Sequence, residues 1–151
     1  QTALEDSIKK NLEGKDEMET SAIMVNPKNG EIIALAGGKD YSKSQYNTAI
    51  NSKRQVGSTM KPILYYSALE NGLTPASTFL SKPTTFKIDD KTTYSPSNYG
   101  NLYPNSDITM ALAICYSDNI YAIKTHLFLG EDMLVNYAKR MGITSKLEAN
   151  A

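Results

Sequence analysis

Two short apolar runs separated by a turn sequence constrain the fold of this chain more than any other feature. Residues 21–25 and 31–36 are almost continuously apolar, and the five residues Asn26-Pro27-Lys28-Asn29-Gly30 lie between them. Proline presets a turn, and an asparagine–glycine pair tolerates positive φ, so the pattern predicts a β-hairpin. Strands without polar alternation are covered on both faces. We therefore expect an α+β fold, in which helices pack on both faces of an antiparallel sheet.

Helical periodicity governs much of the remaining sequence. Leu4, Ile8 and Leu12 recur at a spacing of four, which predicts a one-sided helix over residues 1–12. Other helices are predicted over 58–70, 108–115, 119–129 and 132–141. Ser106 or Asp107 is expected to cap the helix that starts at Ile108.

Two stretches without periodicity, 39–56 and 73–105, are predicted to be long loops. Four prolines interrupt the second stretch, and loops of that length are usually functional or held against a larger body.

Composition excludes several classes of function. The 151 residues carry no net charge, so no basic field would attract nucleic acid. No apolar stretch approaches the roughly 18 residues of a membrane span, which favours a soluble segment. The single cysteine rules out an internal disulfide, and the single histidine, His126, lies in no metal-ligand pattern. We predict neither a metal nor a cofactor.

The segment Gly57-Ser58-Thr59-Met60-Lys61-Pro62 contains the strongest candidate for chemistry. Serine and lysine three apart on a helix share one face, so a neutral lysine amine could take the proton of the serine hydroxyl. Proline is tolerated only in the first turn of a helix, which places the helix start at or near Ser58. Free backbone amides and the helix dipole there would favour an oxyanion. Gly57 would leave room for a substrate carbonyl.

A second candidate element is Ser117-Asp118-Asn119, a polar trio between two predicted helices. Each element alone can also be explained by a structural role without chemistry. A serine followed by a lysine three residues later also occurs at Ser7, and it fits a capping serine with a solvated lysine. The trio alone fits a turn between helices, with Ser117 or Asp118 as the cap of the helix that follows. Their combination in this order is what motif logic associates with β-lactamases and penicillin-binding proteins.

Together with their surroundings, these motifs resemble the penicillin-binding transpeptidase family, and within it the bifunctional class A members. The hairpin sequence from Val25 to Gly38, the segment Tyr46-Asn47-Thr48-Ala49, Arg54-Gln55, and Pro96-Ser97-Asn98-Tyr99 follow the family's order, as does Gly142-Ile143 near the end. The resemblance covers essentially the whole chain.

The resemblance implies a D,D-transpeptidase of peptidoglycan synthesis that works through a serine acyl-enzyme. Ser58 would attack the stem peptide and would also be acylated by β-lactams. Lys61 would be its base, Ser117 would relay a proton toward the leaving amine, and Asn119 would hold the substrate amide. The parent protein would be membrane-anchored at the extracytoplasmic face of the bacterial cell membrane.

One family element is absent from the sequence. The Lys-Thr/Ser-Gly motif does not occur: Lys91-Thr92 is followed by Thr93, and Lys124-Thr125 by His126. We therefore interpret residues 1–151 as the N-terminal part of the domain, an incomplete fragment with the first β-hairpin and a helical region. The missing strand would supply a carboxylate-binding lysine and the second oxyanion amide. We expect the fragment alone to be inactive and to self-associate through an unpaired strand edge and apolar surface.

The sequence is compatible with two alternative functions. A D,D-carboxypeptidase or β-lactamase on the same scaffold would need a residue that activates water for deacylation, and no convincing one is found. A noncatalytic β-lactam sensor or scaffold module would keep the serine without turnover. The tyrosines at positions 94, 99 and 103 are interpreted as anchors of their loop.

Overall fold

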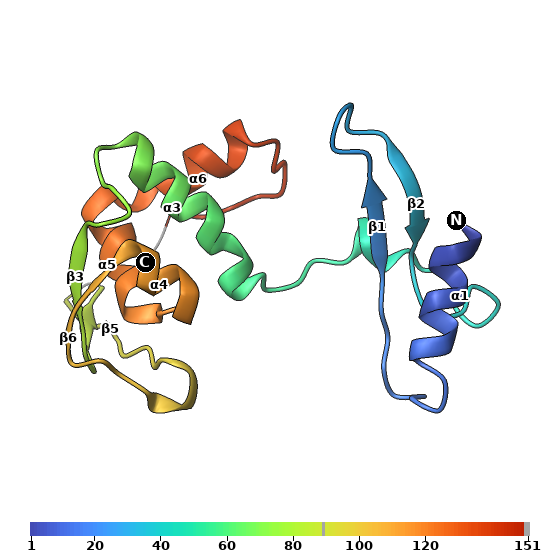
Figure 1. Cartoon of the computed structure of the whole chain (residues 1–151), viewed down its shortest axis with the longest axis horizontal. Coiled ribbons are helices and arrows are strands. Elements are labelled where there is room, and N and C mark those ends of the chain that lie inside the picture. Colours follow the sequence, from blue (N-terminus) through green and yellow to red (C-terminus); the bar gives the residue numbers. More distant parts are fainter. Residues whose placement is uncertain (89, 150–151) are drawn as a thin grey trace. The chain divides into compact units, whose positions relative to one another are not determined.

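A computed structural model of the chain describes residues 1–88 and 90–149, which form two compact units divided between Gln55 and Val56 (Figure 1). They are called unit 1 and unit 2. In the described residues, no helix combines the length and the apolar character needed to cross a bilayer.

Unit 1 contains the predicted hairpin and the predicted first helix. Its elements are α1 (Thr2–Asn11), β1 (Ala22–Val25), β2 (Ile32–Ala36) and the short helix α2 (Thr48–Asn51). The two strands pair antiparallel, from Ala22 opposite Ala36 to Val25 opposite Ile32, with an irregularity in register after Met24. Helix α1 packs against β2. The hairpin prediction is confirmed, whereas α2 was not predicted within the loop over 39–56.

The β1–β2 hairpin exposes several apolar side chains. Neighbouring residues Ile32 and Ile33 point to opposite faces of β2, and they are 59% and 56% exposed. Ile23 and Val25 of β1 are also exposed. Both faces of the hairpin therefore carry exposed aliphatic side chains. Within unit 1, helices do not cover both faces of the sheet as the sequence predicted.

Unit 2 holds most of the helices and two further small sheets. Its helices are η1 (Gly57–Met60), α3 (Lys61–Glu70), η2 (Tyr99–Asn101), α4 (Met110–Tyr116), α5 (Asn119–Leu129) and α6 (Glu131–Arg140). Its strands are β3 (Thr78–Ser81), β4 (Phe86–Lys87), β5 (Thr93–Tyr94) and β6 (Ser106–Thr109). β3 pairs antiparallel with β6, and β4 with β5. Three of these strands lie in the stretch predicted to be one long loop.

The predicted helix start at Ile108 is wrong. Residues 106–109 instead form β6, in which Ile108 pairs with Phe79 of β3. The cap of α4 is Thr109, whose side chain accepts a hydrogen bond from Leu112 N at 3.3 Å. The apolar run from Ile108 onward reads as helical by itself, and only pairing with a distant strand turns its first residues into β-structure. The predictions for 119–129 and 132–141 are confirmed to within one residue.

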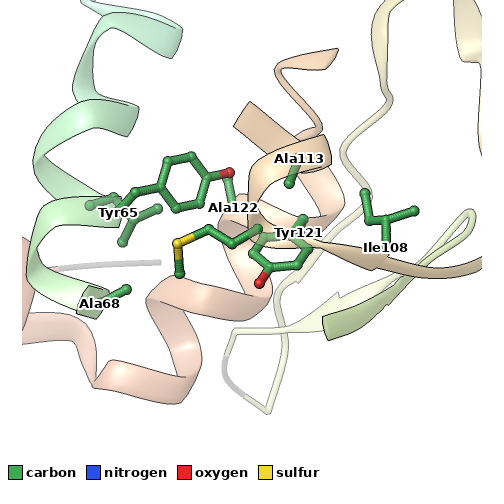
Figure 2. Packing of buried hydrophobic residues seen from close by; sticks show 8 residues of the cluster. Tyr65, Ala68, Ile108, Ala113, Tyr121 and Ala122 are labelled. Carbon is green, nitrogen blue, oxygen red and sulfur yellow. The ribbon is translucent and has the colours of Figure 1, made fainter. Parts of the chain in front are cut away.

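The core of unit 2 lies where α3, α4, α5 and β6 meet (Figure 2). Its buried side chains are Leu64, Tyr65, Ala68, Ile108, Met110, Ala113, Tyr121 and Ala122. The Tyr121 ring lies 6.1 Å from the ring of Tyr65 and 5.1 Å from that of Phe79. The alanines let the helices approach closely around these rings. This packing fixes the start of α3 relative to the junction of α4 and α5.

Candidate active site

The start of α3 places the candidate nucleophile. Ser58 lies in the short 3-10 turn η1, and the α-helix begins at Lys61 with Pro62 in its first turn. Pro62 lies in the first helical turn as predicted, but Ser58 belongs to the tighter turn that precedes the α-helix. Gly57 has a φ of +55°, a left-handed conformation that glycine adopts without strain. A Cβ atom on Gly57 would meet no other atom within 4 Å, so the space beside it is open.

Lys61 contacts the second predicted element rather than the serine of its own motif. Its Nζ donates to the Ser117 carbonyl oxygen at 2.6 Å, to Ser117 Oγ at 3.0 Å and to Asn119 Oδ1 at 2.7 Å. An ammonium has three hydrogens, so these three acceptors use all of them. The structure thus brings Lys61, Ser117 and Asn119 together.

Ser117 connects this lysine to the candidate nucleophile. Ser117 Oγ donates to Ser58 Oγ at 3.1 Å while it accepts from Lys61. Ser117 is the C-cap of α4 and has φ +52° and ψ 43°, the left-handed region that non-glycine residues rarely occupy. This backbone conformation turns the chain sharply between α4 and α5. Outliers of this kind are often found at functional sites.

Asn119, the first residue of α5, has both ends of its side-chain amide engaged. Besides accepting from Lys61, it donates from Nδ2 to the Ser97 carbonyl oxygen at 2.7 Å. Its backbone N–H donates to Asn98 Oδ1 at 2.8 Å. The loop before η2 therefore holds Asn119 by side chain and backbone together.

Asp118 is the buried centre of the trio. It is 2% exposed, and its carboxylate accepts from Ser81 Oγ at 2.5 Å, Asn98 Nδ2 at 2.6 Å and Tyr121 N at 2.7 Å. The last bond is the N-cap of α5. The sequence-based alternative for the trio, in which Ser117 or Asp118 caps the next helix, is confirmed for Asp118, whereas Asn98 was placed in a family segment without a role. Ser81 carries no sequence signal, because its part depends on β3, which was not predicted.

The environment of Lys61 makes loss of its proton easier than for a lysine in water. Partial burial lowers the pKa of the Lys61 ammonium, and the negative charge of Asp118 opposes that shift without cancelling it. An amine with a lowered pKa is more readily available as a base near neutral pH.

A cleft of about 680 Å³ opens beside these groups. Its lining residues come from η1, the η2 loop and the junction of α4 and α5: Ser58, Ser97, Asn98, Tyr99, Gly100, Asn101, Tyr116, Ser117 and Asn119. All of them belong to unit 2. In residues 1–88 and 90–149 no group of His, Cys, Asp or Glu side chains is arranged to hold a metal ion.

The exposed aromatic side chains at this cleft were not predicted as site residues. Tyr99 is 93% exposed and Tyr116 is 74% exposed. The interpretation of Tyr99 as a loop anchor is therefore wrong, because its ring is not packed into the protein. A pattern of tyrosines in a loop does not distinguish an anchoring ring from one that stands at a cleft.

Comparison with known proteins identifies the class to which this fold and site belong. The family model described as "Penicillin binding protein transpeptidase domain" matches residues 20–150. The chain belongs to this family and corresponds to the N-terminal portion of its domain. It is 45% identical over 99% of its length to "Penicillin-binding protein 2D" of Bacillus subtilis, and 30% identical over 86% of its length to "Penicillin-binding protein 1A" of Escherichia coli.

Solved structures agree with that assignment. The crystal structure of Penicillin-Binding Protein 1A from Haemophilus influenzae matches 82% of this chain with a TM-score of 0.77 and 31% identity, and this chain covers 18% of that one. The D,D-transpeptidase domain of a peptidoglycan glycosyltransferase from Eggerthella lenta shares the fold, with a TM-score of 0.69 over 93% of this chain and 37% of that one. The chain spans only 22% and 15% of the lengths of the two curated relatives named above.

Proposed function

We propose that this chain supplies the nucleophile side of a D,D-transpeptidase cleft in peptidoglycan synthesis, with Ser58 as the residue that is acylated. The observation that carries the proposal is the chain of contacts from Lys61 Nζ through Ser117 Oγ to Ser58 Oγ. Membership of the transpeptidase family supports the choice of reaction.

The proposed activation of Ser58 runs through Ser117. As the hydrogen bonds stand, donors point from the Lys61 ammonium toward Ser58 Oγ, which is the polarity expected of a protonated lysine. When Lys61 is neutral, both hydroxyls can turn: Ser58 donates to Ser117, and Ser117 donates to Lys61. The proton of Ser58 then reaches Lys61 as Ser58 Oγ attacks the carbonyl carbon. Direct transfer to Lys61 was the expectation from sequence, whereas the geometry favours this relay.

Bond making and breaking then follow acyl transfer. Ser58 Oγ bonds to the carbonyl carbon of the D-Ala–D-Ala peptide bond, and the C–N bond breaks as a proton returns through Ser117 to the leaving amine. An amino group of a neighbouring stem peptide then attacks the acyl carbon. The new C–N bond forms, the ester bond to Ser58 Oγ breaks, and the proton lost by the amine returns through Ser117 to Ser58 Oγ. Asn119, at the cleft, would hold the substrate amide, and the open space beside Gly57 would admit the carbonyl. Two easier steps thus replace one difficult step.

The partners and location proposed for the parent protein follow from the family. They are peptidoglycan stem peptides and β-lactam antibiotics, at the extracytoplasmic face of a membrane-anchored protein. The sequence lacks a Lys-Thr/Ser-Gly motif, so we propose that these 151 residues alone do not catalyse the reaction.

The decisive experiment is intact-mass measurement after incubation with a β-lactam. It uses a version of this chain that continues through the rest of the domain, including the Lys-Thr/Ser-Gly strand, referred to below as the extended chain. We expect one stable adduct, which disappears in Ser58→Ala. Ser7→Ala is the matched control, because Ser7 and Lys10 repeat the serine–lysine spacing on α1, and it should keep the adduct.

Absence of an adduct on the extended chain would overturn the proposal. Rapid loss of the adduct by hydrolysis would assign a β-lactamase instead. A stable adduct without acyl transfer from a stem-peptide substrate to an amine would assign a sensor. Transfer that depends on Ser58 is the result we expect.

A further inference from the structure

The side chain of Asn98 occupies a position between the cleft and the interior. It is 8% exposed, in the loop between β5 and η2. Its amide nitrogen donates to Asp118 Oδ2 at 2.6 Å, and its amide oxygen accepts from Asn119 N at 2.8 Å. One side chain therefore contacts two consecutive residues of the trio.

The partner of Asn98 on the interior side is itself immobilised. Asp118 also accepts from Ser81 of β3 and caps α5 through Tyr121 N. A buried carboxylate with several charge-assisted hydrogen bonds is held firmly, because loss of any donor leaves it poorly solvated. Asn98 is thereby fixed to both β3 and the start of α5.

The amide oxygen of Asn98 binds Asn119, which lines the cleft. The backbone N–H of Asn119 is held by Asn98, and the adjacent carbonyl of Ser97 takes one of the two side-chain N–H groups of Asn119. Lys61 takes the amide oxygen. An amide nitrogen has two hydrogens, so one N–H of Asn119 is left for a substrate carbonyl.

We infer that Asn98 is a positioning residue for acyl transfer, which orients the Asn119 amide toward substrate and keeps its oxygen on Lys61. The inference rests on the proposed function, because it assigns Asn98 a role in that reaction. It concerns a residue outside both the serine–lysine and the serine–aspartate–asparagine motifs.

The chemistry at position 98 requires a short side chain that carries a donor and an acceptor on the same carbon. Aspartate offers no donor to the Asp118 carboxylate and would place two negative charges together. Alanine makes neither hydrogen bond. Glutamine has both groups but is longer by one methylene, so it cannot satisfy both partners without shifting the loop or Asn119.

The test measures the rate constant of β-lactam acylation and the preceding dissociation constant separately, on the extended chain and its Asn98→Ala variant. We expect acylation efficiency to fall about 10- to 100-fold, the scale that small misplacements of reacting groups produce. Asn136→Ala is the matched control, because Asn136 is an exposed residue of α6 outside the site, and it should acylate as the parent does.

A double-mutant cycle separates positioning from general support of the fold. If Asn98 acts through Asn119, Asn98→Ala should have little further effect on acylation in an Asn119→Ala background. A purely structural role would instead lower the unfolding midpoint and leave acylation by the folded protein unchanged in both backgrounds. Rates are therefore measured on protein shown to be folded by circular dichroism. Asn98→Gln replaces Asn98→Ala if the latter does not fold, with the same expectation.

The experiment distinguishes failure of the proposed function from failure of the role assigned to Asn98. If the extended chain is not acylated at all, the proposed function fails. If it is acylated and Asn98→Ala acylates within about twofold of it, the proposed function stands and the role of Asn98 is overturned.

Discussion

Ser117 Oγ lies 3.1 Å from Ser58 Oγ, although the two serines are 59 positions apart in the sequence. The contact exists because α3 and the junction of α4 and α5 pack around a shared core. The Ser117 hydroxyl therefore links Lys61 to Ser58 through two hydrogen bonds. The consequences can be tested by changing the hydroxyl, the backbone and the surrounding charge one at a time.

Removing the Ser117 hydroxyl should affect activity and stability separately. Ser117→Ala and Ser117→Gly both delete the relay, so each should lower β-lactam acylation of the extended chain by about 10²- to 10⁴-fold. Only glycine relieves the positive φ, so Ser117→Gly should be more stable than Ser117→Ala by about 1 kcal/mol. Acylation kinetics and urea denaturation of the pair measure the two effects. Equal stability would mean that the left-handed backbone costs nothing here, and full activity of either variant would contradict the relay.

The pH dependence of acylation should report the pKa of Lys61. Burial lowers this pKa below its ordinary value of 10.5, so the neutral amine forms, and the rate rises, at a lower pH than for a solvated lysine. Asp118 favours the ammonium. Asp118→Asn should therefore lower the pKa further and move the rising limb of the pH–rate profile to lower pH. Asparagine can still cap α5.

The control for that shift is a carboxylate outside the site. Asp107 is exposed on β6, so Asp107→Asn should leave the midpoint of the profile in place. A midpoint that moves upward in Asp118→Asn, or does not move, would show that another group sets the rising limb.

The sequence located the candidate site better than it described the structure around it. Pro62 limits where a helix can begin, and Gly130 ends α5, so local rules predict these boundaries well. β6 was misassigned because Ile108 and Thr109 become a strand only through pairing with β3. Local periodicity contains no information on such a partner.

The same limit applies to the side chains of the site. Spacing alone placed Lys61 beside Ser58, whereas the structure directs its Nζ to Ser117 and Asn119, residues more than fifty positions away. Burial of Asp118 and its bonds to Asn98 and Ser81 depend on the tertiary fold. The trio and the Pro-x-Asn-Tyr segment could be found in the sequence, but their connection could not.

Two buried tyrosines should respond differently to loss of the hydroxyl. The Tyr65 side chain is buried, and its hydroxyl has no hydrogen-bond partner among the described residues; burial raises the pKa of this phenol. The Tyr121 hydroxyl donates to the Ser77 carbonyl oxygen at 2.7 Å. Tyr65→Phe should leave the free energy of unfolding unchanged or raise it, by up to about 1 kcal/mol, and Tyr121→Phe should lower it by about 1 kcal/mol. Denaturant titration of the extended chain compares them. A clear loss in Tyr65→Phe would reveal a partner for its hydroxyl.

The exposed hairpin should make the 151-residue chain associate with itself. Both faces carry exposed isoleucines. Among the described residues β1 and β2 have no third strand beside them, although the Gln1 side chain bonds the backbone N–H and carbonyl of Leu35 at the edge of β2. Sedimentation velocity should therefore show larger species for this chain than for the extended chain at equal concentration. Ile33→Lys should reduce the association, because a charge disfavours stacking of that face. Tyr41→Lys, which changes an exposed aromatic residue outside the hairpin strands, should not reduce it. If the unsubstituted 151-residue chain is monomeric, this expectation is wrong.

The buried carboxylate of Asp118 also has an evolutionary consequence. It accepts from Ser81 and Asn98, which lie 37 and 20 positions away in the sequence, and from the first turn of the adjoining helix α5. A substitution that removes one of these donors leaves the Asp118 carboxylate buried without a full set of hydrogen bonds, which destabilises the fold. A second substitution is then needed to compensate for the first. Positions 81, 98 and 118 should therefore covary across homologues, and a drift to apolar residues should occur at all three or at none.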